Sequence, residues 1–356
     1  MTNFMSRVTL PFFISHQGCP HTCVFCDQRA ISGATGSLPD STEITEKVHA
    51  WRCSAGERPL EVAFFGGTFS ALQRETQERL LAPLQPLLRD GTVASVRIST
   101  RPDSIDTDSV RWLARHGVGT IELGVQSMDD GVLAAAGRGH DAAVSEAAIR
   151  CVKAHGLCVG AQLLPGLPGD TPEKSLCSLE RVIAAGADFV RLYPVVVLAG
   201  TELARRFLAG EYRPLGLDEG VSLCKQLLLV AMRAGVDVVR IGLQADEGFS
   251  GDAVIAGCWH PALGQLVRSE LYFDLLCRLA SGSGGGVPLS IRCHSSRVSD
   301  CVGQGRGNLR RLGEQWLLLK VKPDSHLLPE EVALDYVNQC IKGDIVTAHY
   351  SITYEV

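Results

Sequence analysis

The sequence lacks the features that would take a protein into a membrane or draw it to nucleic acid by charge alone. No apolar run approaches the roughly 18 to 20 residues needed to span a bilayer. Residues 1–8 carry no apolar core of the kind a signal peptide has. The formal net charge is −5, which gives no overall attraction to anionic partners. We therefore expect a cytoplasmic protein without a membrane partner, in which any RNA contact is local.

Disulfide bonds are also unexpected, although the chain has 13 cysteines. A reducing compartment keeps thiols free and makes clustered cysteines candidates for metal binding or catalysis. Ten of the 13 are scattered singly. Cys151, Cys158, Cys177 and Cys224 lie among Val, Leu and Ala, where a thiol behaves as a small apolar side chain. The remaining three cysteines form one close group.

The first 200 residues alternate short β-rich apolar runs with segments of helical spacing. The expected strands are 8–15, 60–65, 93–99, 119–126, 158–164 and 188–197. The expected helices between them are 41–55, 70–89, 103–116, 129–136, 141–155 and 171–185. Repeated strand–helix units predict a parallel sheet with right-handed crossovers, curved into a partial (βα)6 barrel of the α/β class. In such a sheet the functional site lies at the carboxyl ends of the strands.

The pattern changes after residue 200. Helices are expected at 217–234 and 261–280, with a strand at 236–243 between them. Beyond a Gly/Ser-rich connector, strands are expected at 289–293, 316–322 and 346–354, around a helix at 329–341. We therefore predict four parts: a barrel core at 1–200, an extension packed on the barrel at 201–280, the connector at 281–286, and a small α+β appendage at 287–356.

A group of three cysteines follows the first expected strand. Cys19, Cys23 and Cys26 are separated by four and three residues. Three thiolates at these spacings can hold one corner of a 4Fe-4S cubane and leave the fourth iron without a protein ligand. A structural zinc site would need a fourth ligand, for which His16 or His21 is available. A ferredoxin-type cluster would need a fourth cysteine, and no other cysteine lies at a comparable spacing.

The Cys-x3-Cys-x2-Cys pattern, with Phe25 before its last cysteine, resembles the signature of the radical SAM superfamily. Further motifs of that family follow at successive strand ends, so the resemblance spans residues 11–201. It implies a 4Fe-4S cluster on Cys19, Cys23 and Cys26, with S-adenosylmethionine (SAM) bound at the open iron. It also implies an electron donor such as flavodoxin or ferredoxin.

The resemblance extends to the residues expected to contact SAM. Gly66, Gly67 and Thr68, after the second strand, resemble the motif that binds the amino group of the methionine moiety. Glycine there permits close approach and exposes carbonyl oxygens to an ammonium group. Ser99 and Thr100, at the third strand, resemble a Glu-Thr segment of the elongator catalytic subunit, with serine in place of the glutamate. Their hydroxyl groups can reach the ribose.

Later strand ends continue the resemblance to the elongator subunit and to oxygen-independent coproporphyrinogen oxidase. Gln126 would contact the methionine or ribose moiety, and Arg138 would pair with the methionine carboxylate as a bidentate donor. Gln162 stands where the coproporphyrinogen enzymes tend to carry an Asp, and its amide can still bind a ribose hydroxyl. Tyr193, at the sixth strand, is the candidate catalytic residue on the substrate side.

By this resemblance the protein is an enzyme that reductively cleaves SAM to a 5′-deoxyadenosyl radical, which abstracts a hydrogen atom from the substrate. The likeness to the elongator subunit implies modification of transfer RNA (tRNA) at the wobble uridine. Two alternatives stay open. One is a radical enzyme acting on a small molecule, as coproporphyrinogen oxidase does. The other is an iron-sulfur binding or delivery protein without radical chemistry.

An arginine-rich segment lies between residues 291 and 311, where Asp300 is the one acidic residue. Its five arginines are interspersed with glycines: Arg292, Arg297, Arg306, Arg310 and Arg311. Such a segment can bind the phosphates of RNA or of a nucleotide, and it can equally form a solvated surface.

Overall fold

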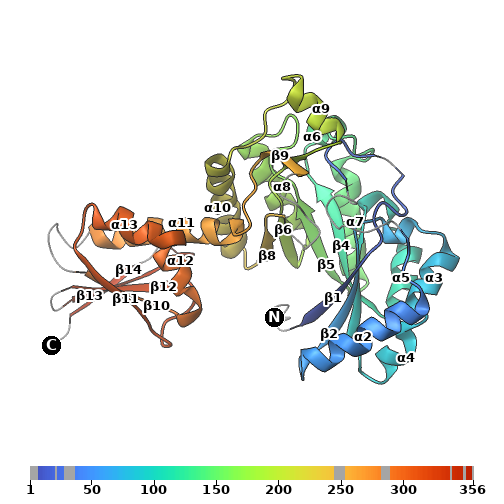
Figure 1. The fold of residues 1–356 in the computed structure, drawn as a ribbon, viewed down its shortest axis with the longest axis horizontal. Coiled ribbons are helices and arrows are strands. Elements are labelled where there is room, and N and C mark those ends of the chain that lie inside the picture. The colour runs from blue at the N-terminus through green and yellow to red at the C-terminus, as the bar shows by residue number, and fades with distance from the viewer. Residues whose placement is uncertain are drawn as a thin grey trace. The chain divides into compact units, whose positions relative to one another are not determined.

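The computed structural model describes residues 7–20, 22–27, 37–243, 253–281, 289–336, 339–347 and 350–354. The chain separates into two compact units, which Figure 1 shows as ribbons. Unit 1 comprises Met1–Gly216 and Val236–Trp259, and unit 2 comprises Leu217–Gly235 and His260–Val356. Within the described ranges, no helix has the length and apolar character needed to cross a membrane.

Unit 1 contains a curled sheet of seven strands in the order β1-β2-β3-β4-β5-β6-β8, and every neighbouring pair is parallel. The strands are β1 (Val8–Phe13), β2 (Leu60–Phe65), β3 (Ser95–Thr100), β4 (Val118–Gln126), β5 (Cys158–Leu163), β6 (Phe189–Leu192) and β8 (Asp237–Ile241). The predicted α/β partial barrel is confirmed. The strand expected at 236–243 forms β8, which pairs with β6 and so joins the barrel sheet as its seventh strand.

The expected strand at 188–197 is divided in two. It forms β6 in the main sheet and β7 (Val196–Leu198), which pairs antiparallel with β9 (Val254–Gly257). Pro194 lies at the break, and because proline has no N–H to donate, it interrupts the hydrogen-bonded ladder. The end of β6 therefore turns away from the sheet at the position where Tyr193 lies.

Helices follow the strands, and most of them cover the outer side of the sheet, whereas α9 (Glu202–Leu208) packs against β7 (Figure 1). The helices are α2 (Ser41–Ala55), α3 (Arg74–Leu81), α4 (Leu84–Arg89), α5 (Thr107–Arg115), α6 (Asp130–Ala135), α7 (Ala142–Ala154), α8 (Pro172–Ala185) and α9. Asp40, Asp106, Asp129, Asp141 and Thr171 each accept a backbone N–H at a helix start. The expected helix at 70–89 is split into α3 and α4, because Pro83 lacks the N–H that a continuous helix would use.

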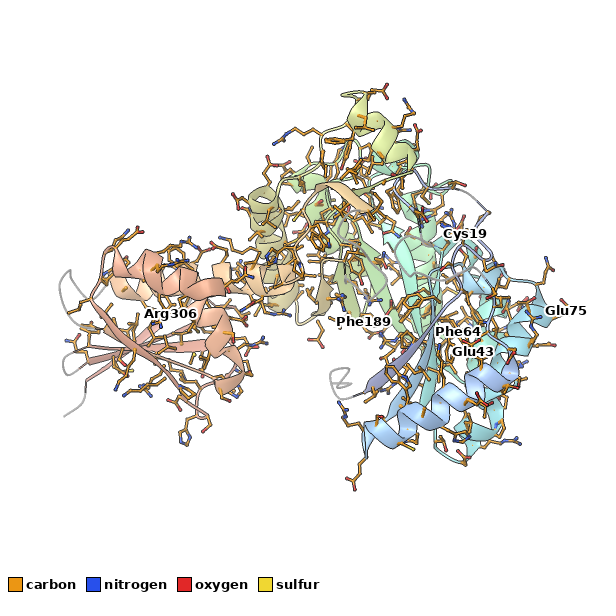
Figure 2. All side chains as sticks on the ribbon, in the orientation of Figure 1. Cys19, Glu43, Phe64, Glu75, Phe189 and Arg306 are labelled. Atoms are coloured by element: carbon orange, nitrogen blue, oxygen red, sulfur yellow. The ribbon has the colours of Figure 1, made fainter. Side chains whose placement is uncertain are left out.

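The two faces of the sheet differ because successive side chains of a strand point to opposite sides. The outer face is apolar: Phe12 and Phe64 stack with ring centroids 5.7 Å apart, and Phe64 also contacts Phe69 (Figure 2). Phe64 is fully buried. The next residue, Phe65, points inward and lines a cavity with polar neighbours.

Unit 2 combines helices with a second sheet. Its helices are α10 (Leu217–Arg233), α11 (Leu263–Ser281), α12 (Val298–Val302) and α13 (Gly307–Gly313). Its strands are β10 (Leu289–Cys293), β11 (Leu318–Pro323), β12 (Glu331–Tyr336), β13 (Gln339–Asp344) and β14 (Tyr350–Tyr354), in the order β11-β10-β12-β13-β14. Only β10 and β11 pair in parallel within this sheet. A side chain at Gly343 would lie 2.8 Å from Leu279, so glycine lets α11 approach β13 closely.

The expected helix at 329–341 is wrong, because this segment forms the strands β12 and β13. The run Glu-Val-Ala-Leu favours a helix by propensity, but Val332 and Leu334 are both buried at strand spacing. Leu334 pairs with Ile291 of β10 on one side and with Ile341 on the other. Pairing with distant strands therefore outweighs local propensity.

Two further expectations concern the connector and the scattered cysteines. Within the connector, residues 282–286 lie outside the described residues, and the four-part division stays a prediction. None of the 13 cysteines forms a disulfide bond. Cys224 is buried as expected of a small apolar side chain, but Cys177 is exposed. The buried positions of α8 include Ser175 and Ser178, and Cys177 lies between them on the opposite side of the helix.

Candidate functional site

A cavity of about 560 Å³ lies in unit 1 at the carboxyl ends of the strands. Every site residue predicted from the sequence lines it: Cys19, Cys23, Phe25, Cys26, Gly66, Gly67, Thr68, Ser99, Thr100, Gln126, Arg138, Gln162 and Tyr193. These residues come from six strand ends far apart in the sequence. The structure thus brings the whole predicted set together, while their individual roles stay predictions.

The cysteine loop follows β1 and begins near Cys19 (Figure 2), and backbone hydrogen bonds hold it at its centre. The N–H of Val24 donates to Ala136 O at 3.1 Å, and Val24 O accepts from Leu203 N–H at 2.7 Å. Val24 is buried in an apolar cluster against which Phe25 packs. Cys23 is therefore also buried, whereas Cys19 is exposed.

The three sulfurs share the cavity without forming a closed metal site. Within the part of the chain that the structure describes, no three His, Cys, Asp or Glu side chains lie close enough to hold a metal ion. His16 lines the same cavity, and His21 lies outside the described residues. The donor set itself is three thiols, which suits iron in a cluster better than a hard cation.

The glycine pair after β2 packs directly on the start of the cysteine loop. A side chain at Gly67 would lie 2.5 Å from Ile14 O and 2.6 Å from Gln17 O. Thr68 N–H donates to Gln17 O at 2.8 Å, and its hydroxyl lies 3.3 Å from the sulfur of Cys19. No residue with a Cβ fits at Gly67 without moving this backbone. The two loops therefore form one wall of the cavity.

Two guanidinium groups approach the buried sulfur of Cys23. Arg138 Nη1 donates to Cys23 Sγ at 3.1 Å, and Arg101 Nη1 lies 3.9 Å from the same sulfur. Arg138 also donates to Gly124 O, and its Nε has no partner among the described residues. Positive charge beside a sulfur stabilises a thiolate electrostatically. The sequence prediction for Arg138 is a carboxylate contact, and its unpartnered Nε is a donor available for one.

Arg101 was missed by the sequence analysis. Its guanidinium forms a bidentate pair with Asp103 at 2.9 and 2.8 Å and donates to Arg138 O. Burial raises the pKa of Asp103, but the hydrogen bonds and the charge of Arg101 lower it by a larger amount. The pKa of Asp103 therefore lies below its usual range. Burial and the nearby Arg138 both lower the pKa of His140. The Arg-Pro-Asp run after the third strand was the signal that could have identified the pair.

Gln126 combines two unusual features. Its φ is +71°, so a non-glycine residue adopts the left-handed backbone conformation. This conformation costs on the order of 1 to 3 kcal/mol of folding free energy. Its side-chain Oε1 is buried without a hydrogen-bond partner among the described residues. The sheet register shifts between Leu123 and Gln126, and Gln126 O accepts from Leu164 N–H at 2.9 Å. Backbone strain and an unpaired buried amide oxygen are both typical of binding sites, and the role of Gln126 in SAM binding stays a prediction.

The remaining predicted residues differ in whether their polar groups are available to a ligand in the cavity. The hydroxyl groups of Thr100 and Ser70 lie 2.5 Å apart, and Thr100 is almost fully buried. Ser99 and Gln162 are half-buried on the cavity wall, so their polar groups can reach a ligand. The half-buried ring of Tyr193 has its centroid 5.5 Å from the guanidinium of Arg191.

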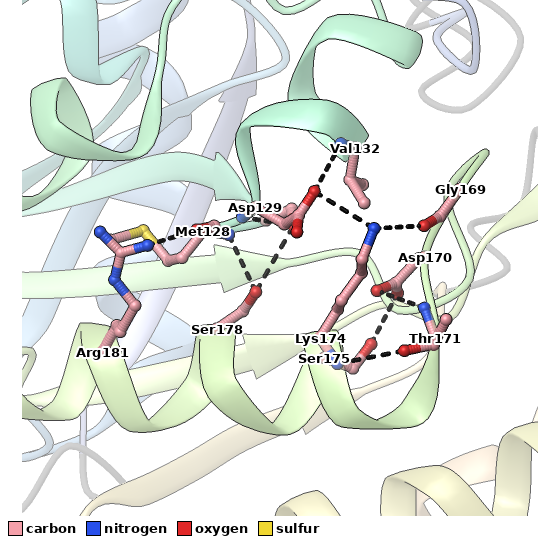
Figure 3. A network of polar contacts seen from close by, with 11 residues as sticks. Met128, Asp129, Val132, Gly169, Asp170, Thr171, Lys174, Ser175, Ser178 and Arg181 are labelled. Carbon is pink, nitrogen blue, oxygen red and sulfur yellow. Dashed lines mark hydrogen bonds and ion pairs between the residues drawn. The ribbon is translucent and has the colours of Figure 1, made fainter.

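A polar network supports the strand ends from the helix side (Figure 3). Lys174 Nζ lies 3.4 Å from Asp129 Oδ1, which also caps α6 through Val132 N–H. Asp170 accepts from Gly166 N–H at 2.8 Å and from Ser175 Oγ at 2.6 Å. Burial raises the pKa of Asp170 despite these hydrogen bonds. The network fixes the turns that follow β4 and β5.

A layer of charged side chains below the strand ends was also missed. Arg97 Nη1 donates to Glu122 Oε1 at 2.7 Å, and Arg191 Nη1 donates to Glu122 Oε2 at 2.6 Å. Arg97 Nε lies 2.7 Å from Glu61 Oε2, and Glu61 is fully buried. Single charges inside apolar strands were the available signal, since buried charges require partners. Their pairing depends on the order of strands in the sheet.

Comparison with known proteins identifies the family. A model described as the radical SAM superfamily matches residues 13–177, and one described as the Radical_SAM C-terminal domain matches residues 187–272. The archaeal Elp3 of Methanocaldococcus infernus, lacking its residues 1–46, has the same fold, with a TM-score of 0.61 and 18% identity. That match covers 97% of this chain and 76% of the other.

Curated relatives match parts of the chain. A tRNA uridine(34) acetyltransferase of Methanocaldococcus infernus is 29% identical over 182 residues, covering 46% of this chain and 34% of the relative. An uncharacterized protein of Methanocaldococcus jannaschii is 27% identical over 218 residues, covering 58% of this chain and 66% of the relative. The chain thus spans between a third and two thirds of the length of these relatives. Since the two family models together match most of the chain, the protein belongs to the radical SAM superfamily, as the cysteine motif predicted.

Proposed function

We propose that the protein is a radical SAM enzyme that holds a 4Fe-4S cluster on Cys19, Cys23 and Cys26 and binds SAM in the cavity beside them. One observation carries the proposal: the three cysteines and all residues assigned to SAM line a single cavity, in which buried polar atoms of Gln126 and Arg138 have no hydrogen-bond partner among the described residues. When bound, the cluster supplies the electron that splits SAM into methionine and a 5′-deoxyadenosyl radical, which takes a hydrogen atom from the substrate.

The residues around Cys23 favour an anionic cluster at this place. Arg138 and Arg101 direct guanidinium groups at the Cys23 sulfur, and Asp103 holds Arg101 in position. The same sulfur is buried, so the charge interactions are stronger than they would be in water. An electron donor such as flavodoxin or ferredoxin supplies the reducing electron, and 13 cysteines outside any disulfide bond suit the reducing cytoplasm.

Other residues that line the cavity provide the contacts that orient SAM. The Gly66-Gly67 turn presents backbone carbonyls to the amino group, and the unpaired Nε of Arg138 serves the carboxylate. Ser99 and Gln162 are placed for the ribose hydroxyls. The unpaired amide oxygen of Gln126 accepts a hydrogen bond from the ligand, which would explain why its strained backbone is retained.

We propose a tRNA nucleoside as the substrate class, which the names of the curated relatives support.

The arginine-rich segment contains two arginines that could contact tRNA phosphates. In this segment, Arg292 pairs with Asp324 and Asp335, and Arg311 pairs with Glu270. Arg297 pairs with Asp300. For Arg306 and Arg310 the described residues offer no ion pair, so these two are the candidates for phosphate contacts. Replacing both by glutamine should weaken retention of a tRNA pool and reduce its salt dependence, whereas unchanged retention contradicts this role.

The function is tested by anaerobic reconstitution with iron and sulfide, reduction with dithionite, and measurement of 5′-deoxyadenosine after addition of SAM. The wild type should form 5′-deoxyadenosine and Cys23→Ala should not. Cys53→Ala, which removes an exposed thiol of α2, is the matched control and should behave as the wild type. If the cluster is intact but SAM is not cleaved with or without tRNA, the protein is a cluster-binding protein without radical chemistry.

A further inference from the structure

The charged layer below the strand ends contains an incompletely paired arginine. Arg191, on β6, lines the cavity, and the one hydrogen bond that its side chain donates to the described residues runs from Nη1 to Glu122 Oε2 at 2.6 Å. Its Nε is buried and has no acceptor within the described residues. A guanidinium group has five N–H donors, and a purely structural arginine in a buried position normally has them satisfied. The unpaired edge of Arg191 is therefore an available anion receptor.

The carboxylates near Arg191 are already shared. Glu122 accepts from Arg97 at 2.7 Å through its other oxygen, and the side chain of Arg97 also lies 2.7 Å from Glu61. Glu61 in turn lies 3.3 Å from Arg7. Among the described residues, Arg7, Arg97 and Arg191 thus share the two carboxylates of Glu61 and Glu122 on the inner face of the sheet. A buried layer with surplus positive charge is more stable when an anion joins it.

The surroundings of Arg191 favour a flat, unsaturated ligand next to that anion. The guanidinium lies 5.5 Å from the ring centroids of both Phe65 and Tyr193. The ring of Phe13 lies 6.4 Å from that of Phe65, and all three rings line the cavity. Aromatic faces of this kind stack on planar groups such as nucleobases or other unsaturated rings.

Arg191 adjoins the residues assigned to SAM. It pairs in register with Gln162 of β5, which is assigned to the ribose, and it precedes Tyr193 by two residues, so it lies on the same face as Tyr193 and one step further from the strand end. A ligand held there would lie beside the cofactor. This placement rests on the proposed function, which puts SAM at the strand ends.

We propose that Arg191 binds an anionic group of the substrate, a carboxylate or a phosphate, and that the rings of Phe65 and Tyr193 hold the planar part of the same molecule. Arg191 is a binding residue in this proposal and takes no part in the chemical step. The substrate class is therefore an unsaturated or aromatic compound with an acidic group that reaches the charged layer.

The proposal is tested with phenyl phosphate, benzoate and uncharged benzamide, titrated into the reconstituted protein by isothermal calorimetry. Arg191→Gln should weaken binding of the two anions roughly tenfold to hundredfold, the value of a charged hydrogen bond, and leave benzamide binding unchanged. Arg191→Lys keeps the positive charge without the planar guanidinium group, and it should lose less affinity for the anions than Arg191→Gln does. Arg205→Gln removes an exposed arginine of α9 and should match the wild type. The anion that binds with the higher affinity identifies the acidic group of the substrate as a phosphate or a carboxylate.

Three results would overturn the proposal. The first is equal affinity of wild type and Arg191→Gln for both anions, and the second is no binding of either anion to the wild type. The third is weaker binding of SAM to Arg191→Gln with no change for the probes, which would assign Arg191 to the cofactor. Failure of the proposed function is distinct: if the wild type forms no 5′-deoxyadenosine but binds the anions through Arg191, the anion site stands and the radical chemistry does not.

Discussion

The two faces of the barrel sheet are built from the same strands and have opposite chemistry. The outer face carries Phe12 and Phe64, both buried under helices in apolar contact. The inner face carries Arg97, Glu122 and Arg191, paired with one another around a cavity. Alternation within a strand lets one segment supply the packing energy on one side and the binding groups on the other. Stability and function are thus divided by face within each strand.

The largest effect should come from the outer face. Phe64→Ala removes a fully buried ring that contacts Phe12 and Phe69, and it should lower the free energy of unfolding by about 4 kcal/mol. Phe65→Ala, one residue away on the inner face, should lower it much less, because Phe65 is half-buried at the cavity. Urea denaturation of both variants measures the difference. Equal losses would show that the two faces contribute alike to stability.

The next effect tests whether the charged layer also stabilises the fold. Glu122→Gln leaves Arg97 and Arg191 without their shared carboxylate and should lower the free energy of unfolding by about 3 kcal/mol. This value is near the lower end of the range for breaking a buried ion pair, because the side chain of Arg191 is partly exposed. Glu75→Gln removes an exposed charge from α3 and should change little. Thermal unfolding compares the two. A stability equal to that of the wild type would mean that solvent screens the layer.

Replacing Gln126 by glycine should have opposite effects on the stability of the fold and on SAM binding. Gln126→Gly relieves the left-handed backbone and should stabilise the protein by roughly 1 kcal/mol while weakening SAM binding. Gln126→Ala loses the amide but keeps the strain, so it should weaken SAM binding without the gain in stability. Urea denaturation and calorimetric titration of SAM separate the two effects. Unchanged SAM affinity in both variants would remove Gln126 from the cofactor site.

The smallest effect concerns pH. Burial, followed by Arg138, lowers the pKa of His140 below the usual 6.5, so the folded state prefers the neutral imidazole. The stability that this provides is fully present above the unfolded pKa and is lost as the pH falls from about 6.5 through the folded value. His140→Gln should flatten the pH dependence of the melting temperature in that range. A wild-type slope in the variant would point to other groups, such as Asp103.

Local signals predicted most of the barrel and the position of the site. The cysteine spacing, the glycine pair and the order of strand ends were visible in sequence, because each depends on neighbouring residues. The pairing of Glu122 with Arg97 and Arg191 was not, because it depends on which strands become neighbours. The hairpin β12–β13 was missed for the same reason, since its residues favour a helix until β10 pairs with them.

The path of the chain between the two units limits how the protein can be divided. The chain leaves unit 1 after Gly216, returns at Val236 to add β8 and β9, and leaves again after Trp259. Three crossings mean that no single cut separates the units, and a chain ending at 259 would still carry α10. During synthesis the seventh strand emerges only after α10, so the barrel sheet is completed late. Exchange of the whole of unit 2 between relatives by recombination would therefore require three breakpoints, one at each crossing.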